Sequence, residues 1–282
     1  MVLAGLLASG RLSGRALQDE QFLFLGAGEA GVGIAELIAR AVRQRTGCSL
    51  RAARSRIALV DSKGLVTSSS PHLAAHKQPY AHPVPAGYDP ESPDALLAAV
   101  DALRPTCLVG VSAVASAFTE AVVRAMARHT PHVPVIMALS NPTSRAECTA
   151  AQAYAWTNGA CVFASGSPFE PVTLADGRTL TPGQGNNAYV FPGVGLACVS
   201  VAAKRVTDGD MLVAAEALAA LVSESQLAAG CVYPPLSDLR RVSARLAAAV
   251  ATNLYARGDA CLAPQPEDLL AHCEAFMYNP LA

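Results

Sequence analysis

The segment Phe22–Val42, FLFLGAGEAGVGIAELIARAV, constrains the fold of this chain more than any other. Residues 22–25 form a short apolar run typical of a buried strand, and Gly26, Gly28 and Gly31 then match the pattern G-x-G-x-x-G. In this pattern the first glycine permits a tight turn, the second lets a pyrophosphate approach the backbone, and the third lets the following helix pack closely. An ordinary strand–helix turn could hold such glycines. The strand before them and the apolar helix after them favour a dinucleotide-binding turn.

Composition limits the class of protein. The chain has 282 residues, of which 52% are hydrophobic and 15% charged, so it has enough apolar side chains for a large core. The net charge of −1 gives no basic field for nucleic acid or an anionic membrane. No apolar run reaches the ~18 residues that a membrane span needs. We therefore expect a globular protein with no nucleic-acid or membrane partner.

The eight cysteines are scattered and form no C-x-x-C pair. Several, such as Cys107, Cys161 and Cys198, fall inside expected strands or helices. This distribution predicts buried reduced thiols, and neither a disulfide framework nor a zinc site. The N-terminal stretch MVLAGLLASGRLSGRALQ resembles a targeting peptide in its arginines, but its apolar run is short, so we expect a helix beside the first strand.

Apolar strand patterns alternate with amphipathic helix patterns. The expected strands are 22–25, 57–60, 107–110, 135–139 and 160–164. The expected helices are 94–103, 118–128 and 145–156, followed by C-terminal helices at 196–206, 209–222 and 242–255. For the helix at 145–156, Ser144 and Glu147 match a capping box. Continuously apolar strands that alternate with helices predict an α/β fold, a doubly wound, mostly parallel Rossmann-type sheet with C-terminal helices.

In such a sheet, ligands bind beyond the carboxyl ends of the strands. Asp61 closes the second expected strand, where a dinucleotide fold places the acid that contacts the ribose. Ser62 and Lys63 follow it and leave NAD and NADP both open. Val111, Ser112, Asn141 and 165–167 follow other expected strands. His72 and His76, four residues apart in a polar loop, lack the glutamate of a zinc-binding H-E-x-x-H, so we interpret them as solvated.

Two adjacent amides, Asn186 and Asn187, lie in the glycine-rich run PGQGNNAYVFPGVG. An amide offers both a donor and an acceptor, which suits a substrate carboxylate or hydroxyl, or a nicotinamide carboxamide. A turn stabilised by asparagine side chains is an equal alternative.

Several long motifs, in order, resemble the malic enzymes. They are FLGAGEAGVGIA, DSKGL at 61–65, ALSNPTSRAECTAAQAYAWTNGACVFASGSPFEPV, PGQGNNAYVFPGVG and YPPL at 233–236. The resemblance implies oxidative decarboxylation of L-malate to pyruvate with NAD or NADP and Mn²⁺ or Mg²⁺. It also implies a homo-oligomer, either a dimer or a tetramer.

The resemblance and the strand ends together suggest the site residues. For the cofactor they are Gly26, Ala27, Gly28, Glu29, Ala30, Gly31, Asp61, Ser62, Lys77, Val111, Ser112 and Asn141, and for the substrate Asn141, Asn186 and Asn187. Ser62 and Lys77 match positions in NADP-using animal enzymes, and a lysine is a suitable partner for a ribose 2′-phosphate, so the resemblance favours NADP over NAD.

The family's tyrosine acid, lysine base and metal-binding acids belong to an upstream part that is not matched here. We therefore expect residues 1–282 to be the NAD(P)-binding domain, with a core at about 14–200 and a helical extension at about 201–282. We expect no catalytic or metal-binding residue within it and no activity from the chain alone. Asp19 and Glu20 precede the first strand at its amino end, so they are poor substitutes for metal ligands.

The sequence leaves two further functions and the compartment open. One alternative is a non-catalytic module that binds NAD(P) or pairs with full-length subunits. The other is a different Rossmann oxidoreductase that uses His129 or His132, although both lie on the amino side of the fourth expected strand. The resemblance implies the cytoplasm or the mitochondrial matrix, and any presequence that decides between them would lie upstream.

Overall fold

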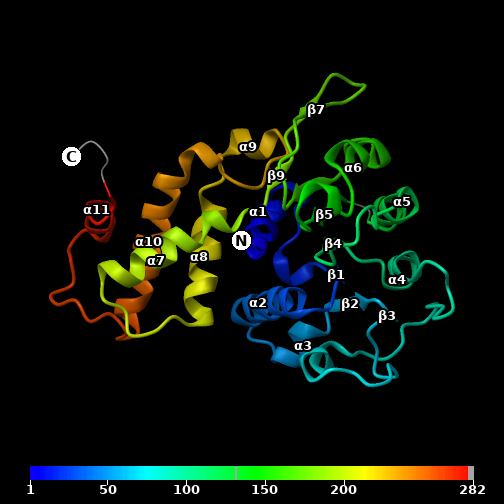
Figure 1. Cartoon of the computed structure of the whole chain (residues 1–282), viewed down its shortest axis with the longest axis horizontal. Coiled ribbons are helices and arrows are strands. Elements are labelled where there is room, and N and C mark those ends of the chain that lie inside the picture. Colours follow the sequence, from blue (N-terminus) through cyan, green and yellow to red (C-terminus); the bar gives the residue numbers. More distant parts are fainter. Residues whose placement is uncertain (131, 279–282) are drawn as a thin grey trace.

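The structure is a computed structural model and describes residues 1–130 and 132–278. Its centre is a seven-stranded sheet in the order β3-β2-β1-β4-β5-β6-β9 (Figure 1). The strands are β1 (Phe22–Leu25), β2 (Ile57–Asp61), β3 (Gly64–Leu65), β4 (Cys107–Gly110), β5 (Val135–Ala138), β6 (Val162–Ser165) and β9 (Gly183–Gln184). All neighbours are parallel except β2 and β3. The predicted doubly wound, mostly parallel sheet is confirmed.

The strand order indicates where a ligand would bind along the sheet. From β1 the chain continues on one side to β2 and on the other to β4, so the direction of winding reverses between β1 and β4. In open α/β sheets the ligand crevice lies outside the carboxyl ends of the strands at this reversal. Leu25 is in register with Val60 on one side and Gly110 on the other, so the three strands end at one level.

The sheet separates two apolar cores because successive residues of a strand point to opposite faces. Phe22 and Phe24 join a core that includes α1, α2 and the C-terminal helices, whereas Leu23 joins the core under α4, α5 and α6. The sequence-distant helices α1 and α8 pack together within the first core. The helices are α1 (Val2–Ser13), α2 (Glu29–Thr46), α3 (Leu50–Arg54), α4 (Ala95–Leu103), α5 (Glu120–His129), α6 (Ala150–Thr157), α7 (Phe191–Ser200), α8 (Asp208–Ala220), α9 (Glu224–Ala228), α10 (Leu239–Ala256) and α11 (Leu269–Ala275).

Two predicted helices have wrong boundaries. The helix expected at 145–156 begins only at Ala150, and its capping box is formed by Thr149 and Gln152 instead of Ser144 and Glu147. Both pairs fit the same local pattern, and the second is used because the side chain of Glu147 is buried under the sheet end. The helix expected at 196–206 is likewise displaced, since α7 ends at Ser200.

Several short elements were not predicted. They are the short helices α3, α9 and α11, the strands β3 and β9, the hairpin of β7 (Val172–Thr173) and β8 (Thr179–Leu180), and the 3₁₀ helices η1 (Leu17–Asp19), η2 (Ala75–Tyr80), η3 (Thr143–Arg145), η4 (Asn187–Tyr189) and η5 (Leu236–Asp238). Each strand of this group has two residues, too few for a periodic pattern to stand out in the sequence.

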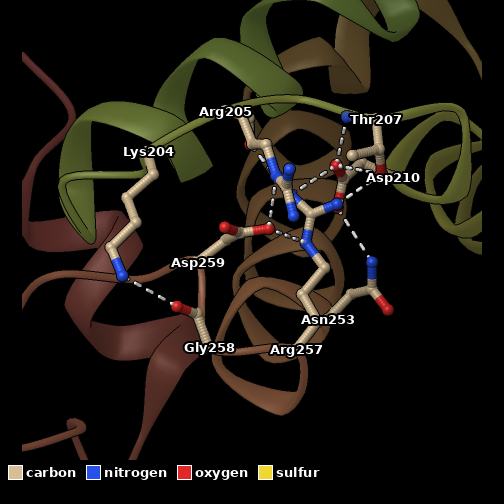
Figure 2. Close-up of polar contacts among 8 residues, drawn as sticks. All are labelled: Lys204, Arg205, Thr207, Asp210, Asn253, Arg257, Gly258 and Asp259. Atoms are coloured by element: carbon tan, nitrogen blue, oxygen red, sulfur yellow. Dashed lines mark hydrogen bonds and ion pairs between the residues drawn. The ribbon is translucent and has the colours of Figure 1, made fainter.

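The C-terminal helices are joined by a buried ion network (Figure 2). The carboxylate of Asp210, on α8, is fully buried and lies 3.0 Å from Arg257 Nη2, just beyond α10. Asp210 also accepts hydrogen bonds from Asn253 Nδ2 at 2.8 Å and from the Thr207 N–H at 2.7 Å. Arg257 Nε in turn lies 3.1 Å from Asp259 Oδ2. These contacts fix the start of α8 against the end of α10.

All eight cysteines are free thiols. Cys107, Cys148, Cys161 and Cys273 are buried as predicted, and burial raises the pKa of the Cys161 thiol to about 12. Cys48, Cys198 and Cys231 are only half-buried and Cys261 is exposed, so the prediction of buried thiols is wrong for these four. Among the described residues, no helix is both long and apolar enough to cross a membrane.

Candidate functional site

The glycine turn has the geometry that its sequence predicts. Gly26 follows β1 with φ +114°, and a Cβ there would lie 2.7 Å from the Val111 carbonyl oxygen. A Cβ on Gly31 would lie 2.3 Å from the Gly26 carbonyl oxygen, so this glycine is needed for α2 to approach the turn. A Cβ on Gly28 would meet nothing within 4 Å, so Gly28 faces open space. Gly28 caps α2 without a side chain, which leaves the first N–H groups of the helix available for an anion.

A cavity of about 540 Å³ lies beside this turn, at the ends of β1, β2 and β4. Ala27, Asp61, Ser62 and Lys77 line it together with Val111 and Ser112. Lys77 Nζ lies 2.5 Å from Asp61 Oδ2, with 20% and 18% of the two side chains exposed. The second oxygen, Asp61 Oδ1, accepts a hydrogen bond from the Lys63 N–H at 2.8 Å. The acid expected at the ribose is therefore paired with the lysine expected at the 2′-phosphate.

His76 is a residue of this cavity that sequence reasoning missed. It was interpreted as solvated, but its Nε2 lies 3.3 Å from the Ala27 carbonyl oxygen and its Nδ1 lies 3.8 Å from Glu29 Oε1. His72 is exposed and has φ +51°. The only sequence signal was that His76 directly precedes Lys77.

Glu36, on α2, holds η2 in place. Its Oε2 accepts hydrogen bonds from Tyr80 Oη at 3.0 Å and Arg54 Nε at 2.9 Å. Burial opposes ionisation of Glu36, but the hydrogen bonds from Arg54 and Tyr80 outweigh it and lower the pKa of this carboxyl. Burial, with the nearby Glu36 charge, raises the pKa of Tyr80, so the phenol stays a donor. The 3₁₀ turn that carries His76 and Lys77 is thus anchored to the helix that follows the glycine turn.

Glu147 joins the loops that follow β4 and β5. Its side chain is fully buried, and its Oε1 accepts hydrogen bonds from the Ser112 N–H at 3.4 Å and from the Ser140 hydroxyl. Its Oε2 accepts from the Ser140 N–H at 3.3 Å. A Cβ on Gly110 would lie 2.4 Å from the Glu147 carboxyl carbon, so a glycine is required there. The sequence predicts a capping role for this glutamate, whereas in the structure it lies between the loops that follow β4 and β5.

A second cavity, of about 720 Å³, lies on the other side of Val111. Asn141, Asn186 and Asn187 line it together with Glu29 and Ala30. The Asn141 side chain is held in place, because its Oδ1 accepts a hydrogen bond from Ser167 Oγ at 2.7 Å. The three amides proposed for the substrate therefore share one cavity with the start of α2.

The structure confirms the turn-stabilising interpretation for Asn186, and the substrate role of the two asparagines stays a prediction. Asn186 Oδ1 accepts a hydrogen bond from the Ala188 N–H at 2.9 Å, so Asn186 stabilises a turn. Asn187 is exposed at the rim of the larger cavity.

Glu20 and His129, which the sequence offered as substitutes for a metal ligand or an acid–base group, line neither cavity. Glu20 is buried and lies 2.9 Å from Arg15 Nε at the amino end of β1. His129 Nε2 lies 2.7 Å from Asp101 Oδ1, beside the end of α4. Among residues 1–130 and 132–278, no three His, Cys, Asp or Glu side chains are grouped as metal ligands would be.

Comparison with known proteins agrees with this geometry. A family model described as "Malic enzyme, NAD binding domain" matches residues 1–255. The chain belongs to the malic enzyme family. It is 50% identical over its whole length to NADP-dependent malic enzyme 3 of Arabidopsis thaliana, and 49% identical to the NADP-dependent malic enzyme of Vitis vinifera.

Solved malic enzymes share the fold. The Entamoeba histolytica enzyme superposes with a TM-score of 0.73 at 19% identity, covering 97% of this chain and 50% of that one. The Pyrococcus horikoshii enzyme gives a TM-score of 0.71 at 20% identity, covering 96% of this chain and 56% of that one.

The chain spans about half the length of the relatives it matches, with 47% of the Arabidopsis enzyme and 46% of the Vitis enzyme covered. One further relative, from Flaveria pringlei, is named chloroplastic. That compartment was not among those that the sequence suggested.

Proposed function

We propose that this chain is the NAD(P)-binding part of a malic enzyme and that it takes NADP in preference to NAD. The observation that carries the preference is the contact between Lys77 and Asp61 at the end of β2. A free carboxylate there would accept a hydrogen bond from a ribose 2′-hydroxyl and repel a 2′-phosphate. Paired with Lys77, its charge is balanced. The ammonium group has three donors, and those that Asp61 does not use can reach a phosphate.

The two cavities suggest how the cofactor would lie. The adenosine half would occupy the cavity of about 540 Å³ beside Asp61, Ser62 and Lys77. The pyrophosphate would cross the turn from Gly26 to Gly31, where Gly28 presents no side chain. The nicotinamide would enter the cavity of about 720 Å³ beyond Val111, next to Asn141. The bound cofactor supplies a hydride acceptor.

The same cavity would hold one wall of the substrate site. Asn141, Asn186 and Asn187 can hydrogen-bond the carboxylate or hydroxyl of L-malate, and the product in the complete enzyme would be pyruvate. Oxidative decarboxylation also needs a base, an acid and a Lewis acid. Among the side chains described around this cavity, Glu29 is the only ionisable one.

We therefore propose that the chain is inactive alone, and that the base, the acid and the Mn²⁺ or Mg²⁺ ligands belong to another part of a complete enzyme. We keep residues 1–282 as one domain, with its core at about 14–200 and a helical extension at about 201–282, and we propose that the complete enzyme is a homo-oligomer.

A non-catalytic module is the second candidate. It is favoured by the same observation, a dinucleotide cradle without an acid–base pair in the adjoining cavity. Co-expression with the Arabidopsis relative, followed by size exclusion, tests whether the chain joins the oligomers of a complete enzyme.

Titration calorimetry of the purified chain with NADP and with NAD tests the main proposal. We expect NADP to bind about tenfold or more tightly than NAD, since a hydrogen bond to a charged group contributes about 1.5–3 kcal/mol. Equal affinities would contradict the NADP preference, and the absence of binding by both would contradict the cofactor role.

A further inference from the structure

His76 stands beside Lys77 on η2, and both side chains line the smaller cavity. Lys77 faces the acid at the end of β2, and His76 faces the glycine turn, with Nε2 3.3 Å from the Ala27 carbonyl oxygen. In a dinucleotide fold the adenosine ribose lies between these two features, the turn after the first strand and the acid after the second. A ribose substituent in this cavity would therefore be flanked by both side chains.

The charged side chains described around the cavity do not balance the negative charge of a bound phosphate. Asp61 and Lys77 cancel each other, and Glu29 adds one negative charge 3.8 Å from His76 Nδ1. Glu29 is 91% exposed, so its side chain can turn into water when a ligand arrives. A phosphate monoester brings roughly 1.5 to 2 negative charges near pH 7. With a neutral His76, nothing described at the cavity balances that charge.

We propose that His76 is a specificity-determining residue for NADP: it takes up a proton when NADP binds and donates a hydrogen bond to the 2′-phosphate. Affinity for NADP, but not for NAD, then falls as pH rises, because histidine loses its charge between about pH 5 and 8. This inference rests on the proposed binding of NADP in the smaller cavity.

The other charged groups near η2 do not replace His76 in this role. Glu36 and Arg54 contact Tyr80, at the opposite end of η2. Lys77 already contacts Asp61 Oδ2, so that carboxylate balances its charge before a phosphate arrives. The 2′-phosphate itself titrates near pH 6 and also affects the pH dependence of binding. A variant of His76 leaves the ligand unchanged, so the difference between the variant and the unmodified chain isolates the contribution of the histidine.

The test is calorimetric titration of the whole chain with NADP and NAD at about pH 6 and about pH 8, in two buffers of different ionisation enthalpy. The variants are His76→Gln and, as a matched control, His72→Gln, since His72 is exposed and does not line the cavity. The buffer dependence of the enthalpy measures proton uptake in the unmodified chain, so the result does not depend on the variant folding.

We expect NADP binding to take up a proton, and its affinity to fall roughly fivefold to tenfold between the two pH values, beyond any change for NAD. In His76→Gln the uptake disappears and the affinity for NADP no longer falls as pH rises, because the phosphate gains negative charge over this range, whereas His72→Gln behaves as the unmodified chain. Tight NADP binding with no proton uptake, or an unchanged pH dependence in His76→Gln, overturns the role of His76 and leaves the proposed function intact. A chain that binds neither nucleotide overturns both.

Discussion

Lys77 Nζ lies 2.5 Å from Asp61 Oδ2, so a residue from a loop with little sequence pattern is paired with the acid that closes β2. We expect Lys77→Ala to weaken NADP binding about 10- to 100-fold, as a charge-assisted hydrogen bond of about 1.5–3 kcal/mol is lost. NAD, which lacks the 2′-phosphate, should change little. Calorimetry with both nucleotides measures this. Lys204→Ala, in the C-terminal helical part, is the control, and an equal loss for NAD and NADP would contradict the assignment.

Gly31, in the first turn of α2, has no room for a side chain beside the Gly26 carbonyl. In Gly31→Ala the new Cβ would lie 2.3 Å from the Gly26 carbonyl oxygen, so the turn must shift. We expect both nucleotides to bind at least about tenfold more weakly and the free energy of unfolding to fall by about 1–3 kcal/mol. Titration and urea unfolding check the two effects.

Gly195→Ala is the matched control for this change. It lies within α7, where a Cβ meets nothing within 4 Å, and we expect a gain of about 0.4–1 kcal/mol in the free energy of unfolding. If Gly31→Ala behaved like Gly195→Ala, the close contact at the turn would be refuted.

Glu147 is buried and accepts hydrogen bonds from the loops after β4 and β5. Glu147→Ala leaves the N–H groups of Ser112 and Ser140 without this partner, and we expect a loss of about 2–5 kcal/mol in the free energy of unfolding. Both nucleotides should bind more weakly, since Ser112 lines the smaller cavity. Urea denaturation and calorimetry measure this, with the exposed Glu170→Ala as the control. A loss no larger than that of Glu170→Ala would rule out the coupling.

Glu36 makes the stability of the fold depend on pH, and the lowered pKa of its carboxyl gives the direction of that dependence. Its pKa is lowered in the folded state by the hydrogen bonds from Arg54 and Tyr80. A lowered folded pKa contributes stability that is present above the ordinary value of 4.5 and is lost as pH falls through the lower, folded value. We expect Glu36→Gln to cost stability at neutral pH and progressively less below the ordinary value. Urea midpoints across acidic pH check it, and a difference that does not change with pH would contradict the pairing.

Asp210 and Arg257 form an ion pair in which the carboxylate is fully buried. Asp210→Ala leaves Arg257 beside one acid instead of two, and we expect a loss of about 3–5 kcal/mol in the free energy of unfolding. The network lies in the C-terminal helices (Figure 2), and none of its residues lines either cavity. Nucleotide affinity of the folded fraction should therefore be unchanged, and a selective loss of NADP binding would contradict this separation.

The parts of the fold that the sequence predicted are those with a local signal. β1 and β4 were predicted to the residue because each is a short, continuously apolar run. The glycine turn was found because the spacing of its glycines is distinctive, and Gly26 and Gly31 each prove to have a backbone requirement of their own. Asp61 and Val111 were placed at the site because parallel strands in register end at one level.

The parts that were missed depend on contacts between distant residues. Ser144 with Glu147 and Thr149 with Gln152 offer two equivalent helix caps, and the choice depends on Gly110, which leaves room for the Glu147 side chain. His76 faces the glycine turn on the same 3₁₀ segment whose Tyr80 is anchored to α2, and no local pattern reveals these contacts. Strands of two residues, such as β9, form because a neighbouring strand has free backbone groups.

The most direct test of the account combines nucleotide affinity and turnover on one sample of the purified chain. NADP binding is measured by calorimetry, and NADPH formation is followed by the nicotinamide absorbance with L-malate, NADP and Mn²⁺. We expect NADP to bind and no NADPH to form. Substantial NADPH formation that requires both malate and Mn²⁺ would mean that this chain contains a metal site and an acid–base pair, and would contradict the central claim.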